Sequence, residues 1–457
     1  MEAKQLLEFL IRLEVWTGLI VVSPFCRLVI RARVNAAIGS TKGVRQKLHN
    51  CYPGRVPMMR RFMALAAIAA ALLGRDFMGA QARNPVRVPC ELVHEMFYVR
   101  ASVNGSAPLW LNLDTGASHS VVDPTVAKTL HLQEGGGGDA SGIGRGQGTR
   151  FGRVSGATIQ IADAVLPNQM LLTLSMNYLA SSIGHVTDGS LGSNIFANYV
   201  VRTDYLRRKV SFFDPSSFEP PRTALSMPLT LRDNMPYIDA AIKLPDGTSA
   251  RGTFLIDSGM IGAAVSINDW FLNEHPELSS IRSLEMPPVQ VVGGTFRYRL
   301  CRLQSLSIGQ YTLDEPIAVL PDLASGVDTD RTIIGTIGAD ALSRFTDTFD
   351  YTGRRLFLTA NKQVHLPFET DMSGLKLTTE PPLFDRFLVD GVTSGSPADQ
   401  AGIRDGDVIA AIDGHPASGL TLERIQYEFQ QLNGVHHLIV ERSGKQLRVD
   451  LKLRRLV

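Results

Sequence analysis

The feature that most constrains this chain is an internal repeat. Residues 114–116 read Asp-Thr-Gly and residues 257–259 read Asp-Ser-Gly, each at the end of an apolar stretch. Upstream, residues 96–99 (MFYV) correspond to residues 235–238 (MPYI). One Asp-Thr-Gly arises easily by chance, but two with the same strand before them do not. A repeat of this length indicates a duplicated structural unit.

The correspondence continues far downstream of the two aspartates. Residues 189–192 (GSLG) match 335–338 (GTIG), and residues 204–208 match 350–354, both with an offset of 146 residues. The two aspartates are offset by 143 residues. Because the length difference is only three residues, the sequence predicts two similar lobes in one chain.

Composition sets the fold class and limits the partners. A chain of 457 residues is expected to form two or three domains, and its 41 glycines and many short apolar runs favour a mainly β protein. The net charge of +2 gives no reason to expect a nucleic acid partner. The four cysteines and the histidines lack metal-site spacing, so we expect neither a metal nor a cofactor.

A leader segment is expected late in the sequence. Arg60 and Arg61 precede an apolar run at 63–74, and Ala80-Gln81-Ala82 follows, which is the order of a signal peptide. We therefore predict a signal peptide at 58–82 within an N-terminal segment 1–82, with 1–57 an upstream extension. Export to a periplasmic or extracellular location without a stable membrane span follows, and an uncleaved membrane anchor is the alternative.

Two cysteines, Cys90 and Cys301, follow the predicted cleavage site. An oxidising compartment permits a disulfide between them. Two free thiols are equally compatible with the sequence, because spacing alone does not place the two residues within bonding range.

The paired motifs at Asp114 and Asp257 resemble those of the pepsin and retropepsin superfamily of aspartic peptidases, over residues 90 to 360. The resemblance implies a bilobal β-barrel fold, with lobes at 83–225 and 226–362. It also implies peptide or protein substrates and a catalytic pair formed within one monomer.

Two neighbouring carboxylates suit this chemistry because both cannot ionise cheaply, so they share one proton. The charged carboxylate can take a proton from water while the protonated one stabilises the oxyanion. Thr115 and Ser258 are expected to brace the two loops by hydrogen bonds. Gly116 and Gly259 are expected to allow the loops to approach closely.

Two glycine-rich segments occupy the positions of flaps, by the same resemblance. The first contains Gly142, Gly144 and Gly146, and the second spans Val289 to Phe296 with Gly293 and Gly294. Such hairpins would close over a bound peptide. For the preceding run at 135–138, a disordered surface loop is the alternative.

The C-terminal segment 363–457 differs in character. Residues 394–409 (SGSPADQAGIRDGDVI) closely resemble PDZ domains of bacterial proteases. Ser373, Gly374 and Leu375 are expected to form the loop that receives a peptide carboxylate, and 375–379 the strand to which a ligand adds. A helix at 421–432 would line this groove. We expect this module to be separable from bond cleavage.

The sequence thus predicts an aspartic endopeptidase whose PDZ module binds extended or C-terminal peptide segments. The alternative is a peptide-binding scaffold with vestigial peptidase lobes. Met260 favours that alternative, because the superfamily that the motifs resemble usually has Ala or Ser after the glycine.

Overall fold

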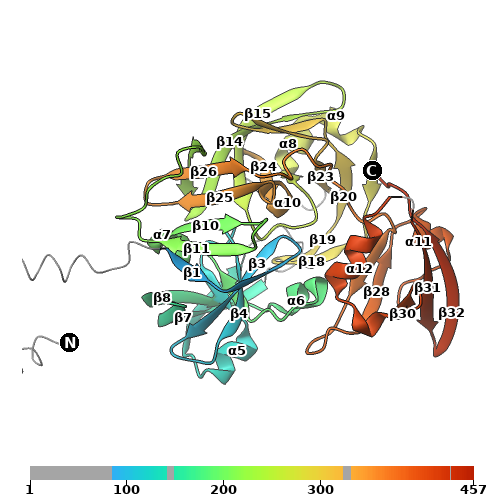
Figure 1. Ribbon diagram of the computed structural model, residues 1–457, viewed down its shortest axis with the longest axis horizontal. Helices are drawn as coiled ribbons and strands as arrows, with labels where there is room; N and C mark the ends of the chain where they lie inside the picture. Colours follow the sequence, from blue (N-terminus) through green and yellow to red (C-terminus); the bar gives the residue numbers. More distant parts are fainter. Residues whose placement is uncertain (1–84, 141–148, 323–330, 433) are drawn as a thin grey trace, which may run out of the picture. The chain divides into compact units, whose positions relative to one another are not determined.

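The computed structural model describes residues 85–140, 149–322, 331–432 and 434–457. β-Strands dominate these ranges (Figure 1), which confirms the predicted fold class. In the same ranges, no helix has both the length and the apolar character needed to cross a membrane. The predicted signal peptide and the first-flap glycines Gly142, Gly144 and Gly146 lie outside the described residues.

The first lobe is an eight-stranded sheet in the order β2-β3-β4-β9-β5-β8-β7-β6, and a further pairing of β3 with β7 closes it on itself. Three short helices, α5 to α7, connect its strands. The bounds are β2 Cys90–Val93, β3 Met96–Val103, β4 Leu109–Leu113, β5 Ser120–Val122, α5 Pro124–Thr129, β6 Glu134–Ala140, β7 Thr149–Ile161, β8 Ala164–Thr173, α6 Asn177–Ile183, β9 Gly189–Leu191 and α7 Ser193–Asn198.

The second lobe repeats this plan in a ten-stranded sheet, with β14, β15 and β24 in the places of β3, β4 and β9. A separate hairpin pairs β18 with β19. The bounds are β13 Thr230–Arg232, β14 Met235–Lys243, β15 Ser249–Asp257, β16 Val265–Ile267, α8 Asp269–Glu274, α9 Pro276–Ser279, β17 Ser283–Glu285, β18 Val289–Val291, β19 Gly294–Phe296, β20 Tyr298–Arg302, β21 Ser305–Ile308, β22 Tyr311–Asp314, β23 Ile317–Pro321, β24 Ile333–Gly338 and α10 Ala339–Leu342.

The repeat extends to burial along equivalent strands. β3 and β14 both begin at the methionine of the repeated motif, and both are buried over most of their length. Their one exposed position is equivalent, Arg100 in β3 and Asp239 in β14. Strands that face the core on both sides lose the simple alternation of polar and apolar residues. This confirms that the predicted duplication is a duplication of structure.

A six-stranded sheet in the order β1-β11-β10-β25-β26-β12 joins the lobes. β10 of the first repeat pairs antiparallel with β25 of the second (Figure 1). β12 crosses the predicted lobe boundary at residue 225 and pairs with β26. The bounds are β1 Val86–Val88, β10 Val200–Asp204, β11 Lys209–Phe213, β12 Leu225–Pro228, β25 Phe345–Asp350 and β26 Arg355–Ala360.

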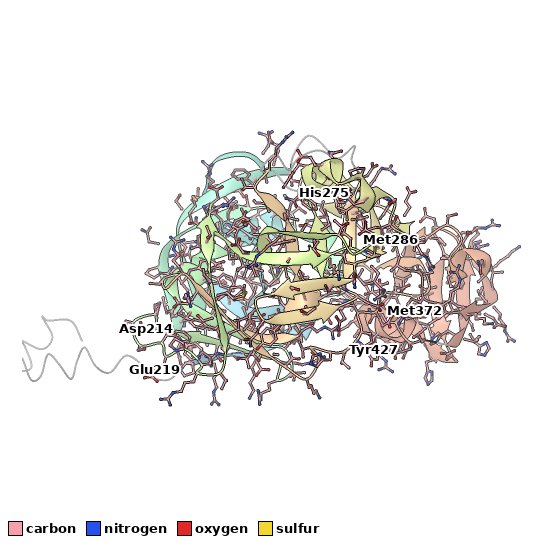
Figure 2. The ribbon with its side chains drawn as sticks, turned by 90° about the horizontal axis from the view of Figure 1, so that it is seen from above. Asp214, Glu219, His275, Met286, Met372 and Tyr427 are labelled. Atoms are coloured by element: carbon pink, nitrogen blue, oxygen red, sulfur yellow. The ribbon has the colours of Figure 1, made fainter. Side chains whose placement is uncertain are left out.

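The C-terminal domain has its own hydrophobic core, which includes Met372 (Figure 2) and the apolar face of α12. Its sheet has the order β27-β28-β29-β31-β32, so β27 is an edge strand. The bounds are β27 Leu375–Thr378, β28 Phe387–Val392, α11 Pro397–Gln400, β29 Val408–Ile412, β30 His415–Pro416, α12 Leu422–Phe429, β31 Val435–Arg442 and β32 Lys445–Lys452, with a 3-10 turn at Ala417–Gly419.

Cys90 and Cys301 are both free thiols in the structure. Cys90 is half-buried on β2 and donates to the backbone oxygen of Arg208, whereas Cys301 is buried on β20. Of the two arrangements that the sequence left open, the structure contains the free thiols.

A carboxyl group is buried in the sheet that joins the lobes. Asp347 is fully inaccessible on β25, opposite Thr203 on β10 and Leu358 on β26. Burial raises the pKa of Asp347 well above its usual range. The folded protein therefore keeps a proton that the unfolded chain releases once the pH exceeds about 4.

We therefore expect Asp347→Asn to flatten the pH dependence of stability. A raised folded-state pKa means that wild-type stability falls as pH rises above about 4, by at most about 1.4 kcal/mol per pH unit from this group. Asn does not titrate, so its stability relative to wild type should increase between pH 5 and 7. Urea unfolding across this range measures the effect, with the exposed Asp163→Asn as control. A constant difference between Asp347→Asn and wild type would contradict the assignment.

Candidate active site

The two repeated aspartates stand at equivalent strand ends. Asp114 directly follows β4, and Asp257 is the last residue of β15. β4 lies between β3 and β9, and β15 lies between β14 and β24. Each aspartate therefore stands at the end of a strand that is hydrogen-bonded to a neighbour on both sides. Both side chains are half-buried. The sequence predicted this pair, and the structure brings it together.

Reciprocal hydrogen bonds join the loops that follow the two strands. Thr115 N–H donates to Ser258 Oγ at 3.1 Å, and Ser258 N–H donates to Thr115 Oγ1 at 2.9 Å. Each hydroxyl also donates to a backbone oxygen of the other lobe, Thr115 to Ile256 at 2.7 Å and Ser258 to Leu113 at 3.1 Å. Both residues are buried, so neither has water as an alternative partner.

The two glycines allow the carboxylates to meet. A Cβ on Gly116 would lie 2.5 Å from Asp257 Cγ, and a Cβ on Gly259 would lie 2.7 Å from Asp114 Cγ. Both distances are far below van der Waals contact, so any side chain would displace the opposite carboxylate. The backbone N–H of each glycine donates to the aspartate of its own loop, at 2.9 Å to Asp114 Oδ1 and 2.8 Å to Asp257 Oδ1.

Burial and mutual repulsion set the protonation of the pair. Burial, and then the charge of Asp257, raise the pKa of Asp114 above its usual range. Burial also raises the pKa of Asp257, while hydrogen bonds from Gly259 N–H, Asp114 and Met260 N–H oppose that rise. More donors therefore favour the charged form at Asp257. The arrangement can hold one proton shared between the two carboxyl groups.

The surroundings of the pair contain polar groups whose roles the sequence did not reveal. Ser190, within the repeated GSLG segment, lies with Oγ 3.5 Å from Asp114 Oδ2. Asn194 accepts from Ser120 N–H at 2.7 Å, and the equivalent Asp340 accepts from Gly262 N–H at 3.1 Å. The sequence did contain a signal for this equivalence: Asn194 and Asp340 are offset by 146 residues, the same offset as the repeated segments beside them.

The Met260 side chain packs on a glycine of the other repeated segment of its own lobe. A Cβ on Gly338 would lie 2.6 Å from Met260 Cε, so the methionine side chain rests on the glycine of the repeated GTIG segment. The backbone oxygen of Met260 accepts from Ala339 N–H at 2.7 Å. Gly338 therefore provides the space for the larger residue, and the sequence argument against activity loses its steric basis.

Two hairpins lie near the site. Residues 135–138, for which a disordered loop was the alternative, belong to strand β6 and pair with β7. The second hairpin joins β18 to β19 through a turn at Gly293, which donates to Thr149 Oγ1 of β7 at 2.9 Å. Gly293 and Gly294 have φ of 94° and 122°, a region that favours glycine.

A helix that the sequence did not reveal lines the site. α6 carries Tyr178, whose pKa is raised to about 12 by burial and by the charges of Asp114 and Asp257. Leu179 of the same helix packs near Ile261, close to Asp257 in sequence. The sequence analysis did not single out the residues of α6.

The predicted carboxylate-binding loop of the C-terminal domain has an internal partner. Ser373 N–H and Gly374 N–H donate to Asp371 Oδ1 at 2.8 Å and 2.9 Å, and Leu375 N–H donates to Ser373 Oγ at 3.0 Å. Burial raises the pKa of Asp371 to about 6. A ligand carboxylate at this loop would have to replace Asp371, which the sequence argument did not foresee.

Among the residues that the structure describes, no group of three or more His, Cys, Asp or Glu side chains is arranged to hold a metal ion. Hydrogen bonds and the paired carboxylates are the chemical resources of the site.

Comparison with known proteins identifies two regions. Residues 99–195 match the aspartyl protease family, and residues 388–442 match the PDZ domain family. The first match includes Asp114 and ends before Asp257. Among solved structures, the chain is similar to the aspartic proteinase from Irpex lacteus, with 16% identity, a TM-score of 0.39, and coverage of 62% of this chain and 99% of that chain. This likeness carries no conclusion about activity. No curated protein matches the sequence.

Removing the cross-lobe hydroxyl should destabilise the protein. Thr115→Val keeps the shape of the side chain but leaves Ser258 N–H and the Ile256 oxygen without their partner. We expect a loss of about 2 kcal/mol in the free energy of unfolding, as for a buried donor left unpaired. Denaturant unfolding measures it. The matched control Thr115→Ser keeps the hydroxyl and should lose less than about 1 kcal/mol. Equal losses would show that packing, not hydrogen bonding, dominates.

Proposed function

Because the chain combines an aspartyl protease domain with a C-terminal PDZ domain, we propose that it is an aspartic endopeptidase acting through Asp114 and Asp257. The observation that carries the proposal is the cross-lobe brace. It places the second aspartate, which lies outside the matched protease region, against the first. A chain without this chemistry would have no need to hold two carboxyl groups at such close range.

The proposed reaction uses a water molecule held between the carboxyl groups. Asp257 takes a proton from the water, whose oxygen attacks the carbonyl carbon of the scissile bond. Asp114 gives its proton to the carbonyl oxygen, which forms a tetrahedral diol. Asp257 then passes its proton to the amide nitrogen, and the C–N bond breaks. Asp114 recovers a proton from the hydroxyl as the new carboxyl group forms, so the pair returns to its starting state.

Protein and peptide chains are the proposed substrates. The hairpins β6–β7 and β18–β19 offer backbone groups that can pair with an extended peptide. The PDZ domain supplies an edge strand, β27, suited to peptide binding by strand addition.

A vestigial peptidase that only binds peptides is the competing function. Met260 was the sequence argument for it, and the packing of that side chain against Gly338 removes the argument. Hydrolysis of an unfolded protein, blocked by a statine-type transition-state analogue, separates the two functions.

We also propose that the protein is exported after removal of a signal peptide at 58–82. The support is the sequence pattern of Arg60 and Arg61, an apolar run and Ala80-Gln81-Ala82. N-terminal sequencing of the exported protein tests this, and a mature chain that begins well before Arg83 would contradict it.

Asp114→Asn and Asp257→Asn should each abolish hydrolysis. Either change removes one member of the proton-sharing pair, and we expect the rate to fall by about a thousandfold or more. The measurement is cleavage of a quenched fluorescent peptide, with circular dichroism to verify the fold. Asp163→Asn is the matched control, because Asp163 is an exposed turn residue. Full activity in either active-site variant would place the chemistry elsewhere.

The enzyme is proposed to work as a monomer, because the two repeats supply both aspartates. Specific activity per chain should stay constant on dilution, while sedimentation reports the oligomeric state at each concentration. A steep fall in specific activity, parallel to dissociation of an oligomer, would refute a monomeric active site.

A further inference from the structure

One end of the PDZ groove between β27 and α12 is filled by another part of this chain. A ligand that adds to an edge strand pairs with its free backbone groups. At the end of β27, however, Thr379 N–H donates to the backbone oxygen of Ser181 in α6, at 3.0 Å. A Cβ on Gly184, which ends α6, would lie 3.0 Å from Leu422 Cβ of α12 and 3.3 Å from Thr379 Cγ2. The end of α6 therefore sits between the strand and the helix that border the groove.

A second segment of the first lobe contacts the same helix. His94 N–H, in the β2–β3 turn, donates to Glu423 Oε1 of α12 at 3.0 Å. α12 is thus held through its first turn by two parts of the first lobe, α6 and this turn.

The root of the second hairpin rests on the opposite side of β27. Lys376 Nζ donates to the backbone oxygen of Pro288 at 2.6 Å, and a Cβ on Gly391 would lie 2.6 Å from Pro287 Cβ. Met286 Sδ (Figure 2) lies 3.9 Å from Thr393 Oγ1. Residues 286–288 lead directly into β18, so the PDZ domain holds the base of the hairpin whose turn contacts β7.

Both held segments also belong to the active-site surroundings. α6 lies beside β18 as well as β27, and its Tyr178 senses the charges of the two aspartates. Val292, in the turn of the second hairpin, packs with Met176 at the start of α6. The contact of Gly293 N–H with Thr149 closes the two hairpins on each other without a bound peptide. An extended peptide that enters between the two hairpins would have to break this bond.

From these contacts we propose that the PDZ domain acts as a clamp on the active site. It holds α6 and the base of the second hairpin in the closed arrangement, in which Gly293 contacts Thr149. An extended peptide that pairs with β27 through Thr379 competes with α6 and releases the clamp. Because the two sites share one element, each biases the other by the same free energy. The sequence predicted a module that is separable from bond cleavage, and this proposal departs from that prediction because the domain contacts α6 and the base of the second hairpin.

The direction of the effect follows from the closed hairpins. If most molecules are closed, apparent substrate affinity is reduced by the fraction that is open. Weakening the clamp increases that fraction, so it should raise activity, whereas damage to the fold would lower it. Only the activity measurement rests on the proposed peptidase function; the contacts of the clamp do not depend on it.

The test uses full-length protein with two clamp variants. Lys376→Met removes the bond to Pro288 together with the ion pair to Asp390, but keeps the apolar stem. Glu423→Ala removes the acceptor for His94 N–H. The matched controls are Lys445→Met, an exposed lysine on β32, and Glu423→Gln, which keeps an acceptor oxygen. Hydrogen–deuterium exchange is measured at α6 and at residues 286–296, together with kcat/KM for a short quenched peptide.

We expect faster exchange at both segments in Lys376→Met and Glu423→Ala, and a rise in kcat/KM of about fivefold, with little change in either control. Unchanged exchange would overturn the clamp. Faster exchange with unchanged or lower kcat/KM would show that the contacts do not restrain the cleft, and would overturn it too. A wild-type protein without inhibitor-sensitive hydrolysis would refute the proposed function instead, and the exchange data would still decide whether the clamp exists.

Discussion

The structure depends on the exchange of hydrogen bonds between Thr115 and Ser258. These bonds cross from one repeat to the other, and they are the reason that two loops 143 residues apart meet at one place. Buried hydroxyls that lose such partners have no water to replace them. The brace therefore fixes the spacing of the aspartates, and the glycines beside them keep that spacing free of side chains.

The same brace explains why the site is chemically unusual. Two carboxyl groups held together in a partly buried site cannot both be charged at low cost, so such a pair favours sharing one proton. The equivalent loops are not identical. Met260 follows the second motif and packs on Gly338, whereas the smaller Ala117 follows the first motif. The duplicated fold tolerates this difference because each loop is supported by the strands of its own lobe.

The C-terminal domain adds a second level of organisation. Its edge strand and helix contact α6, the β2–β3 turn and the root of the second hairpin, all of which belong to the peptidase lobes. A domain joined only by a linker would move independently of the cleft. Here α6 contacts both β27 and β18, and this shared element is the basis of the proposed coupling.

The sequence by itself determined the duplication, the mainly β class and the aspartate pair, because a repeated motif records a repeated strand and loop. It also indicated Thr115, Ser258 and the glycines, whose chemistry is local to each motif. Only the tertiary structure revealed three features: the position of α6 beside the aspartates, the hydrogen bonds of Asp371 within the PDZ loop, and the packing of Met260 on Gly338. These roles depend on how side chains pack in three dimensions, for which the repeated motif carries no signal.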